Sequence, residues 1–133
     1  MKFPAIVFSR RALWVVRSND ILTRTTKVSV KNGVFSGAVV VDADANAQKI
    51  LSAKIRSGYG PLFGYNIFLN RNVIVDLIPD GETFKMDLGE IKQKVIADFN
   101  SWSGWATRGD WPELKANVMR ANSVFQVIEA IGE

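Results

Sequence analysis

Five acidic residues in the middle of the chain are the first candidates for chemistry. Two carboxyl groups that face each other can act as a general acid and base. The spacing of these five does not bring two together. Asp76 alternates with apolar residues on a predicted strand, Asp80 lies in the turn that follows, and Glu82 comes after Asp80. The candidates are Asp42, Asp44, Asp76, Asp80 and Glu82.

The chain contains no histidine and no cysteine. This composition removes the commonest general base, the commonest metal ligand and all thiolate chemistry. No serine has an imidazole to activate it, and no Ser-x-x-Lys pattern occurs. We therefore predict no catalytic residue and lean away from an enzyme.

The sequence "DADAN" has the first three ligand positions of a calcium-binding loop, at Asp42, Asp44 and Asn46. Such a loop also needs a glycine at its sixth position and a bidentate glutamate at its twelfth. Ala47 and Ala53 stand at those two positions. We predict instead a turn in which these side chains cap their own backbone, with no metal site and no cofactor.

Three closely spaced glycines, Gly58, Gly60 and Gly64, suggest a phosphate-binding loop. The dinucleotide fingerprint is one residue shorter and is followed by a helix, whose N-terminus holds the phosphate. Here the predicted element that follows is a strand. We therefore interpret the glycines as a turn or flexible connection.

Positive charge is concentrated in the first third of the chain. The net charge is +4, and residues 1–41 hold seven basic residues against Asp20 alone. Such a surface could bind nucleic acid, anionic lipid or an acidic protein, although scattered solvated charges would give the same count. The candidate nucleic-acid-binding residues, near Trp14, are Arg10, Arg11, Arg17, Arg24, Lys27 and Lys31.

Three tryptophans and one arginine lie close together in "FNSWSGWATRGDW" (99–111). Tryptophan and arginine are enriched in binding hot spots and also stack on nucleic-acid bases. One tryptophan continues the apolar stripe of the preceding helix and another starts the next helix, so both have structural explanations. The middle one is the best candidate for exposure. The predicted partner-binding residues are Trp102, Trp105, Arg108 and Trp111.

The pattern from 12 to 79 favours strands. "ALWVV" (12–16) is short, aromatic and β-branched. Asn32-Gly33 predicts a hairpin that joins strands 23–31 and 34–41, whereas a helix over 21–31, capped by Asn19 or Asp20, is the alternative. "AVVV" has no polar alternation, so both faces of that strand should be covered.

Residues 47–56 fit either a returning strand or a short helix. "YNIFLNRNVIVDLIP" (65–79) predicts a second hairpin, which ends at Pro79 because proline cannot donate to the ladder.

Three helix starts follow in the last third of the chain. Each pairs a capping residue with a glutamate or glutamine three positions later, ahead of an apolar stripe. We predict a single α+β domain over 1–133, with an antiparallel N-terminal sheet (1–85) and two to three C-terminal helices (86–133) packed on one face. The pairs are Asp87 with Glu90, Asp110 with Glu113, and Ser123 with Gln126.

The N-terminal apolar run is broken by Pro4 and by Arg10-Arg11, which argues against a signal peptide. No window approaches the length of a membrane span, so we expect a soluble cytoplasmic protein.

For function, we favour a non-catalytic protein-binding module that holds or neutralises one partner, as small bacterial immunity proteins do. This comparison rests on organisation alone. The alternatives are a nucleic-acid-binding domain that uses the basic first third, and a small-ligand pocket or enzyme of unknown type. Oligomeric state is not predicted.

Overall fold

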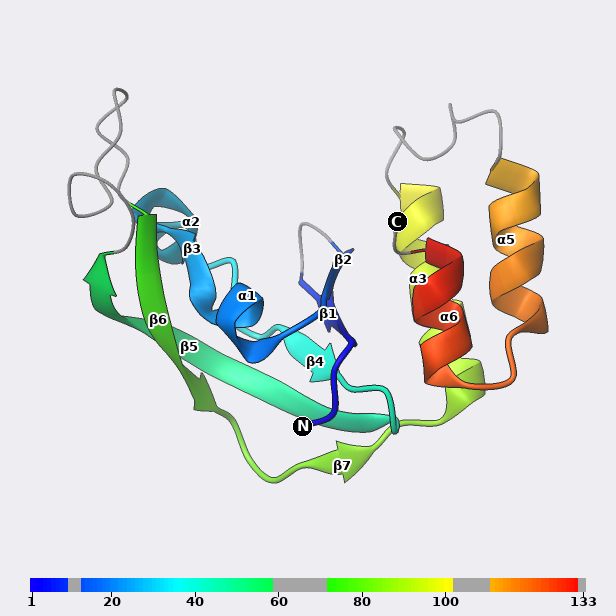
Figure 1. Ribbon diagram of the computed structural model, residues 1–133, viewed down its shortest axis with the longest axis horizontal. Coiled ribbons are helices and arrows are strands. Elements are labelled where there is room, and N and C mark those ends of the chain that lie inside the picture. Colours follow the sequence, from blue (N-terminus) through cyan, green and yellow to red (C-terminus); the bar gives the residue numbers. More distant parts are fainter. Residues whose placement is uncertain (10–12, 59–71, 102–110, 132–133) are drawn as a thin grey trace.

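The computed structural model describes residues 1–9, 13–58, 72–101 and 111–131, and within them it confirms a single α+β domain with an antiparallel N-terminal sheet (Figure 1). Three longer helices follow the sheet in the chain and pack together beside it, while two short helices interrupt its strands. The strands are β1 (Ala5–Phe8), β2 (Leu13–Val16), β3 (Arg24–Thr26), β4 (Val39–Val41), β5 (Asn46–Gly58), β6 (Asn72–Pro79) and β7 (Phe84–Lys85). The helices are α1 (Asn19–Thr23), α2 (Lys27–Lys31), α3 (Leu88–Ser101), α5 (Trp111–Arg120) and α6 (Val124–Ile131).

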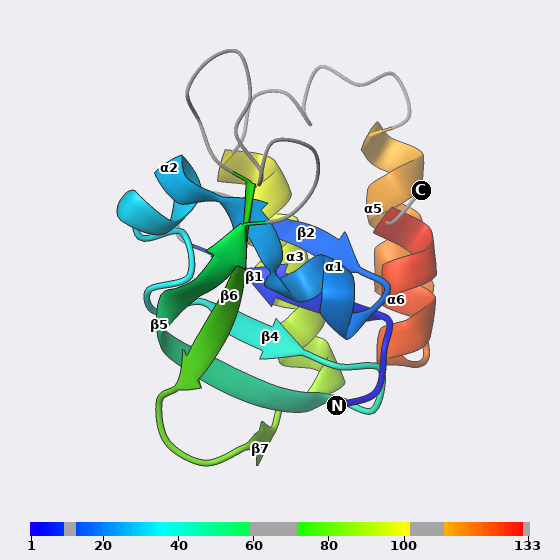
Figure 2. The same ribbon diagram turned by 60° about the vertical axis from the view of Figure 1, so that its left-hand side comes forward.

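The sheet runs in the order β2-β1-β4-β5-β6-β3, and β7 pairs with the start of β5. β5 is the longest of the described strands, and its residues 47–49 pair with β4 while its residues 50–58 pair with β6. Two irregularities in the β5–β6 register, at Leu51 and Arg56, each add one residue to β5. Bulges of this kind bend a strand and increase its twist, and the sheet is correspondingly curled (Figure 2).

Side chains on the two faces of the sheet form two separate cores. On β1, Ile6 points to one face, whereas Ala5 and Val7 point to the other, as strand alternation requires. The helix-side core, on the face covered by the C-terminal helices, contains Ile6, Val41, Ala47, Met86, Ile91, Val95, Ile96, Leu114, Val118, Ala121, Val124, Val127 and Ile128. The concave-side core contains Ala5, Val7, Val16, Leu22, Phe35, Ala38, Val40, Ile50, Val73 and Val75.

The opening of the curled sheet is covered by α1. This helix contacts β2 and β3, the two outermost strands, and also β6 (Figure 2). Its one buried side chain, Leu22, enters the concave-side core, together with Trp14 and Val16 of β2 and Val73 of β6. Burial of a leucine contributes roughly 1.5–3 kcal/mol. α1 is therefore anchored mainly by Leu22.

The C-terminal helices begin where the capping pairs predict, as far as the chain is described. The backbone N–H of Glu90 donates to Oδ2 of Asp87 at 3.4 Å, and that of Gln126 donates to Oγ of Ser123 at 3.2 Å. The Gln126 side chain in turn accepts from the backbone N–H of Asn122 at 2.7 Å. Asp110 lies outside the described residues, although α5 has Pro112 in its first turn as expected.

The predicted hairpin over 23–31 and 34–41 is wrong. The segment forms α1, β3 and α2 instead, and β4 pairs with β1 and β5 rather than with a strand from 23–31. Asn32 has φ −78°, so it cannot form a type I′ turn, which needs positive φ at both central residues. The helical alternative described this region better, but as two five-residue helices with a strand between them.

Asn32-Gly33 ends a helix in this protein. Gly33 has φ 72°, and its N–H donates to the carbonyl of Val30 at 3.0 Å, while the N–H of Val34 donates to that of Ser29 at 3.2 Å. This pair of bonds is the Schellman motif that commonly ends helices, with glycine in the left-handed position. A dipeptide typical of hairpins thus serves as the C-terminal cap of α2.

Of the two alternatives left open for residues 47–56, the structure shows the strand, within β5 (Asn46–Gly58). The predicted end of β6 at Pro79 is confirmed. Val40 and Val41 of β4 belong to opposite cores, so both faces of that strand are covered. Gly60, Gly64 and the first strand of the predicted 65–79 hairpin lie outside the described residues.

Among the described residues, no helix has the length and apolar character needed to cross a membrane.

Candidate functional site

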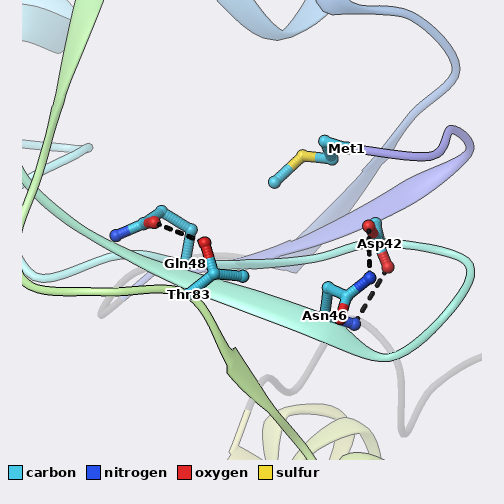
Figure 3. Close-up of a pocket in the computed structure, with 5 residues that line it drawn as sticks. All are labelled: Met1, Asp42, Asn46, Gln48 and Thr83. Atoms are coloured by element: carbon cyan, nitrogen blue, oxygen red, sulfur yellow. Dashed lines mark hydrogen bonds between the residues drawn. The ribbon is translucent and has the colours of Figure 1, made fainter.

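A hollow of about 320 Å³ lies between the turn that joins β4 to β5 and the connection that joins β6 to β7 (Figure 3). Asp42 and Asn46 line one end of the hollow, and Gln48 and Thr83 line the other. The side chain of Met1 points towards the space between them. Two of the residues first considered for metal binding, Asp42 and Asn46, therefore lie together here.

Asp42 is buried, and its carboxylate is fully engaged in the turn. Oδ1 accepts from the backbone N–H groups of Asp44 and Asn46, both at 2.9 Å. Oδ2 accepts from the backbone N–H of Lys2 at 3.1 Å and from Nδ2 of Asn46 at 3.4 Å. These bonds confirm the predicted self-capping turn and fasten the N-terminal residues to it.

The same bonds determine the charge of Asp42. Burial by itself raises the pKa of this carboxyl group, but the backbone N–H groups of Lys2, Asn46 and Asp44 outweigh burial and lower the pKa below 3.8. An acid with a lowered pKa stays ionised at neutral pH and makes a poor proton donor. Asp42 is therefore a structural carboxylate.

At the other end of the hollow, Gln48 is also engaged with its own chain. Its Nε2 donates to the carbonyl of Gly81 at 3.2 Å and to that of Lys49 at 2.9 Å, and its Oε1 accepts from the hydroxyl of Thr83 at 3.2 Å. Within the described residues, no buried side-chain nitrogen or oxygen lacks a hydrogen-bond partner. The polar lining of the hollow thus holds β5 to the β6–β7 connection.

The other candidate carboxylates are not brought together. Asp44 lies 3.6 Å from the Lys2 ammonium, and Asp80 lies 3.7 Å from that of Lys49. Asp76 accepts from the guanidinium of Arg56, and this hydrogen bond is the main reason that its pKa is lowered.

Glu82 is exposed and lies between β6 and β7. In the described part of the chain, no three acidic side chains cluster in a way that could hold a metal ion.

Sequence reasoning did not single out Asp98 on α3. Burial raises the pKa of this carboxyl group above 3.8. The only sequence feature that could have drawn attention to Asp98 is its position near the end of an amphipathic helix.

A second hollow, of about 230 Å³, lies beside the start of α6. It is lined by the β4–β5 turn, by Leu88 and by residues 122–124. Hydrogen bonds involving Ser123 and Gln126 already use the backbone N–H groups of Gln126 and Asn122 at this helix start.

The predicted partner-binding cluster cannot be placed as a unit. Trp102, Trp105 and Arg108 lie outside the described residues. Trp111 is the first residue of α5, and its side chain is likewise outside what the structure describes. Its use in binding stays a prediction.

Half of the predicted nucleic-acid-binding residues lie on one described segment. Arg24, Lys27 and Lys31 are exposed and lie on the continuous segment α1–β3–α2. Arg17 donates from Nη1 to Oε1 of Glu129 on α6 at 2.9 Å, so it is bound within the chain. Arg10 and Arg11 lie outside the described residues.

Two exposed aliphatic side chains lie on the same segment and were not among the predicted site residues. Ile21 on α1 is 52% exposed and Val28 on α2 is 49% exposed. We call the set of Ile21, Arg24, Lys27, Val28 and Lys31 the α1–α2 surface.

Local capping explains why this surface forms. Ser18 caps α1 by accepting from the N–H of Ile21 at 3.3 Å, and Thr26 caps α2 by accepting from that of Ser29 at 3.2 Å. With the N-terminus of each helix capped in this way, Leu22 is buried and Val30 packs against the concave-side core. Ile21 and Val28, on the same two helices, are left exposed.

No protein-family model, curated protein or solved structure matches this chain. The α1–α2 surface combines exposed cations with exposed aliphatic side chains.

Proposed function

We propose that this protein is a non-catalytic protein-binding module that holds or neutralises one partner through the α1–α2 surface. The observation that carries the proposal is the exposure of Ile21 and Val28 on a segment whose neighbouring side chains, Leu22 and Val30, turn inwards. Apolar side chains that a fold leaves exposed can mark interaction sites.

The hydrogen bonds that order the segment support the proposal. A five-residue helix is unstable alone, but α1 and α2 are each capped at both ends and joined through β3 to β6. A surface that is already ordered loses little conformational entropy when it binds. The α1–α2 surface can therefore bind without refolding.

The state of the carboxylates agrees with a non-catalytic role. Asp42 holds the β4–β5 turn, and Asp76 and Asp80 are engaged with basic side chains of β5. A catalytic pair would need two such groups directed at one reacting centre. These three serve separate structural positions instead.

The test is affinity capture from the cells in which the protein is made, with proteins identified by mass spectrometry. The bait variants are Ile21→Ser/Val28→Ser and a control, Met119→Ser/Phe125→Ser. The control residues, on α5 and α6, are 48% and 49% exposed, so they match the test pair in exposure. Thermal unfolding checks that both variants remain folded.

We expect one protein to be retained by the wild type and the control, and lost from the Ile21/Val28 variant. Equal loss from both variants, or no protein retained by the wild type above an empty resin, would refute the α1–α2 surface as the binding site.

Nucleic-acid binding is the second candidate function, supported by the exposure of Arg24, Lys27 and Lys31 on one segment. It predicts an affinity for oligonucleotides that falls steeply with added salt. Titration of a labelled oligonucleotide at low salt tests it, and absence of binding there would exclude it.

A further inference from the structure

We infer that the partner bound by the α1–α2 surface presents acidic side chains around an apolar one, as an acidic protein segment does. This inference rests on the proposed function and adds the chemistry of the partner.

The charge of the surface is the first argument. Residues 19–31 contain three cations, Arg24, Lys27 and Lys31, against Asp20 alone. Lys27 and Lys31 lie four positions apart on α2, so their side chains extend from the same side of the helix. Asp20 lies in the first turn of α1, where its negative charge interacts favourably with the helix dipole. The surface as a whole is therefore positive.

Some cations of the chain already have a carboxylate partner. Lys2, Arg17, Lys49 and Arg56 each lie within 4 Å of a carboxylate of the same chain. Of the carboxylates that the structure describes, none lies that close to Lys27 or Lys31. Both ammonium groups thus remain available to carboxylates of another molecule, which complementary charge would steer to this surface.

The aliphatic side chains distinguish a protein from a nucleic acid. Nucleic acids are bound through phosphates by cations and through bases by aromatic rings. Ile21 and Val28 offer neither contact, and they lose unfavourable hydration only against another apolar group. A protein segment that carries both carboxylates and aliphatic side chains can pair with the lysines of the surface and also pack against Ile21 and Val28.

A membrane is a poorer match, because the exposed apolar part of the α1–α2 surface is small. Helices that adsorb to anionic bilayers bury a continuous apolar face, with large side chains such as Trp, Phe or Leu. α1 and α2 have five residues each, and each exposes one large aliphatic side chain.

The experiment uses a random peptide library displayed on phage and selected on the immobilised full-length protein at low ionic strength. Enriched peptides are synthesised with a fluorescent label, and their affinity is measured by anisotropy. The protein variants are Lys27→Glu, Lys31→Glu, Ile21→Ser/Val28→Ser and, as a control, Lys115→Glu on α5, which is exposed and changes the net charge equally.

We expect enriched peptides to combine Asp or Glu with aliphatic residues. Lys27→Glu and Lys31→Glu should each weaken binding by about tenfold, and Lys115→Glu should not. A peptide whose acidic residues are replaced by lysine should bind Lys27→Glu better than it binds the wild type. This charge-reversal result separates a direct contact from a general loss of stability.

Enrichment of peptides without acidic residues, or equal weakening by Lys115→Glu, would overturn the inference. If only Ile21→Ser/Val28→Ser weakens binding, the inference fails while the proposed function stands. If no enriched peptide depends on either set of residues, both fail. Tighter binding of a labelled oligonucleotide or of phosphatidylserine vesicles than of any peptide, abolished by Lys27→Glu, would overturn the inference in favour of that ligand.

Discussion

Arg17 and Glu129 are 112 positions apart in the chain, yet Nη1 of Arg17 donates to Oε1 of Glu129 at 2.9 Å. Arg17 follows the last residue of β2, and Glu129 lies on α6. The pair therefore links the end of β2, one of the two outermost strands, with α6, the last of the described helices. It also gives Arg17 a carboxylate partner within its own chain.

We predict that this ion pair contributes little to stability. Both side chains are nearly half exposed, and exposed pairs contribute about 0.2–1 kcal/mol. A double-mutant cycle with Arg17→Ala and Glu129→Ala, measured by urea unfolding, should give a coupling energy in that range. The coupling should shrink at high salt because of screening. A salt-independent coupling would show that the pair is better shielded from water than its exposure indicates.

We predict that Asp42→Asn destabilises the fold by about 1–3 kcal/mol at pH 7. The amide can replace one carboxylate oxygen, but its NH₂ group then faces the donors that Oδ2 now accepts from, including the N–H of Lys2. Urea unfolding measures the loss. Asp44→Asn is the matched control, because Asp44 is exposed and loosely paired with Lys2, and it should change stability by less than about 0.5 kcal/mol.

The effect of Asp42 should depend on pH. Its folded-state pKa is lowered from 3.8, so its charge stabilises the fold above that value and this contribution is lost as the pH falls through the lowered pKa. The stability difference between wild type and Asp42→Asn should therefore narrow below about pH 4. A difference that stays constant from pH 7 to strongly acidic pH would contradict the role of the ionised carboxylate.

We predict opposite outcomes for two neighbouring residues of α1. Leu22→Ala removes the side chain that anchors α1 in the concave-side core, and it should cost about 2–5 kcal/mol. Ile21→Ala removes an exposed side chain and should cost less than about 0.5 kcal/mol. Chemical denaturation gives both values, and hydrogen exchange should show faster opening of residues 19–23 in Leu22→Ala only. Equal costs would mean that α1 is held differently from what its burial indicates.

The C-terminal helices could be predicted because their signals are local. Asp87 and Ser123 bond to backbone groups three residues away, and Ile91 and Val95 of the apolar stripe are buried. Such interactions need no knowledge of the rest of the chain. The self-capping turn at Asp42 was predictable for the same reason.

The segment 19–37 could not be predicted because its two signals conflict. Positive φ at a glycine suits both a type I′ turn and a helix C-terminus, and Asn32-Gly33 is compatible with either. The choice depends on Leu22 and Phe35 entering the concave-side core. That core is built from strands that are distant in the sequence.

The sequence predicted the basic residues of the α1–α2 surface but not its exposed aliphatic residues. Lys27 and Lys31 stood out as basic residues, whereas adjacent Ile21 and Leu22 are chemically alike. Which of the two is buried depends on where α1 crosses the sheet. In the same way, the sequence contains no sign that Arg17 would be bound by Glu129.

β5 has a consequence for how the domain unfolds. Ala47 contributes to the helix-side core and Ile50 to the concave-side core, from one continuous strand. Neither core can therefore be completed without β5, and without the C-terminal helices the strands would expose Ile6 and Val41 to water. We expect the strand-rich and helix-rich portions to melt in one cooperative transition, so that neither portion persists as an independently folded fragment.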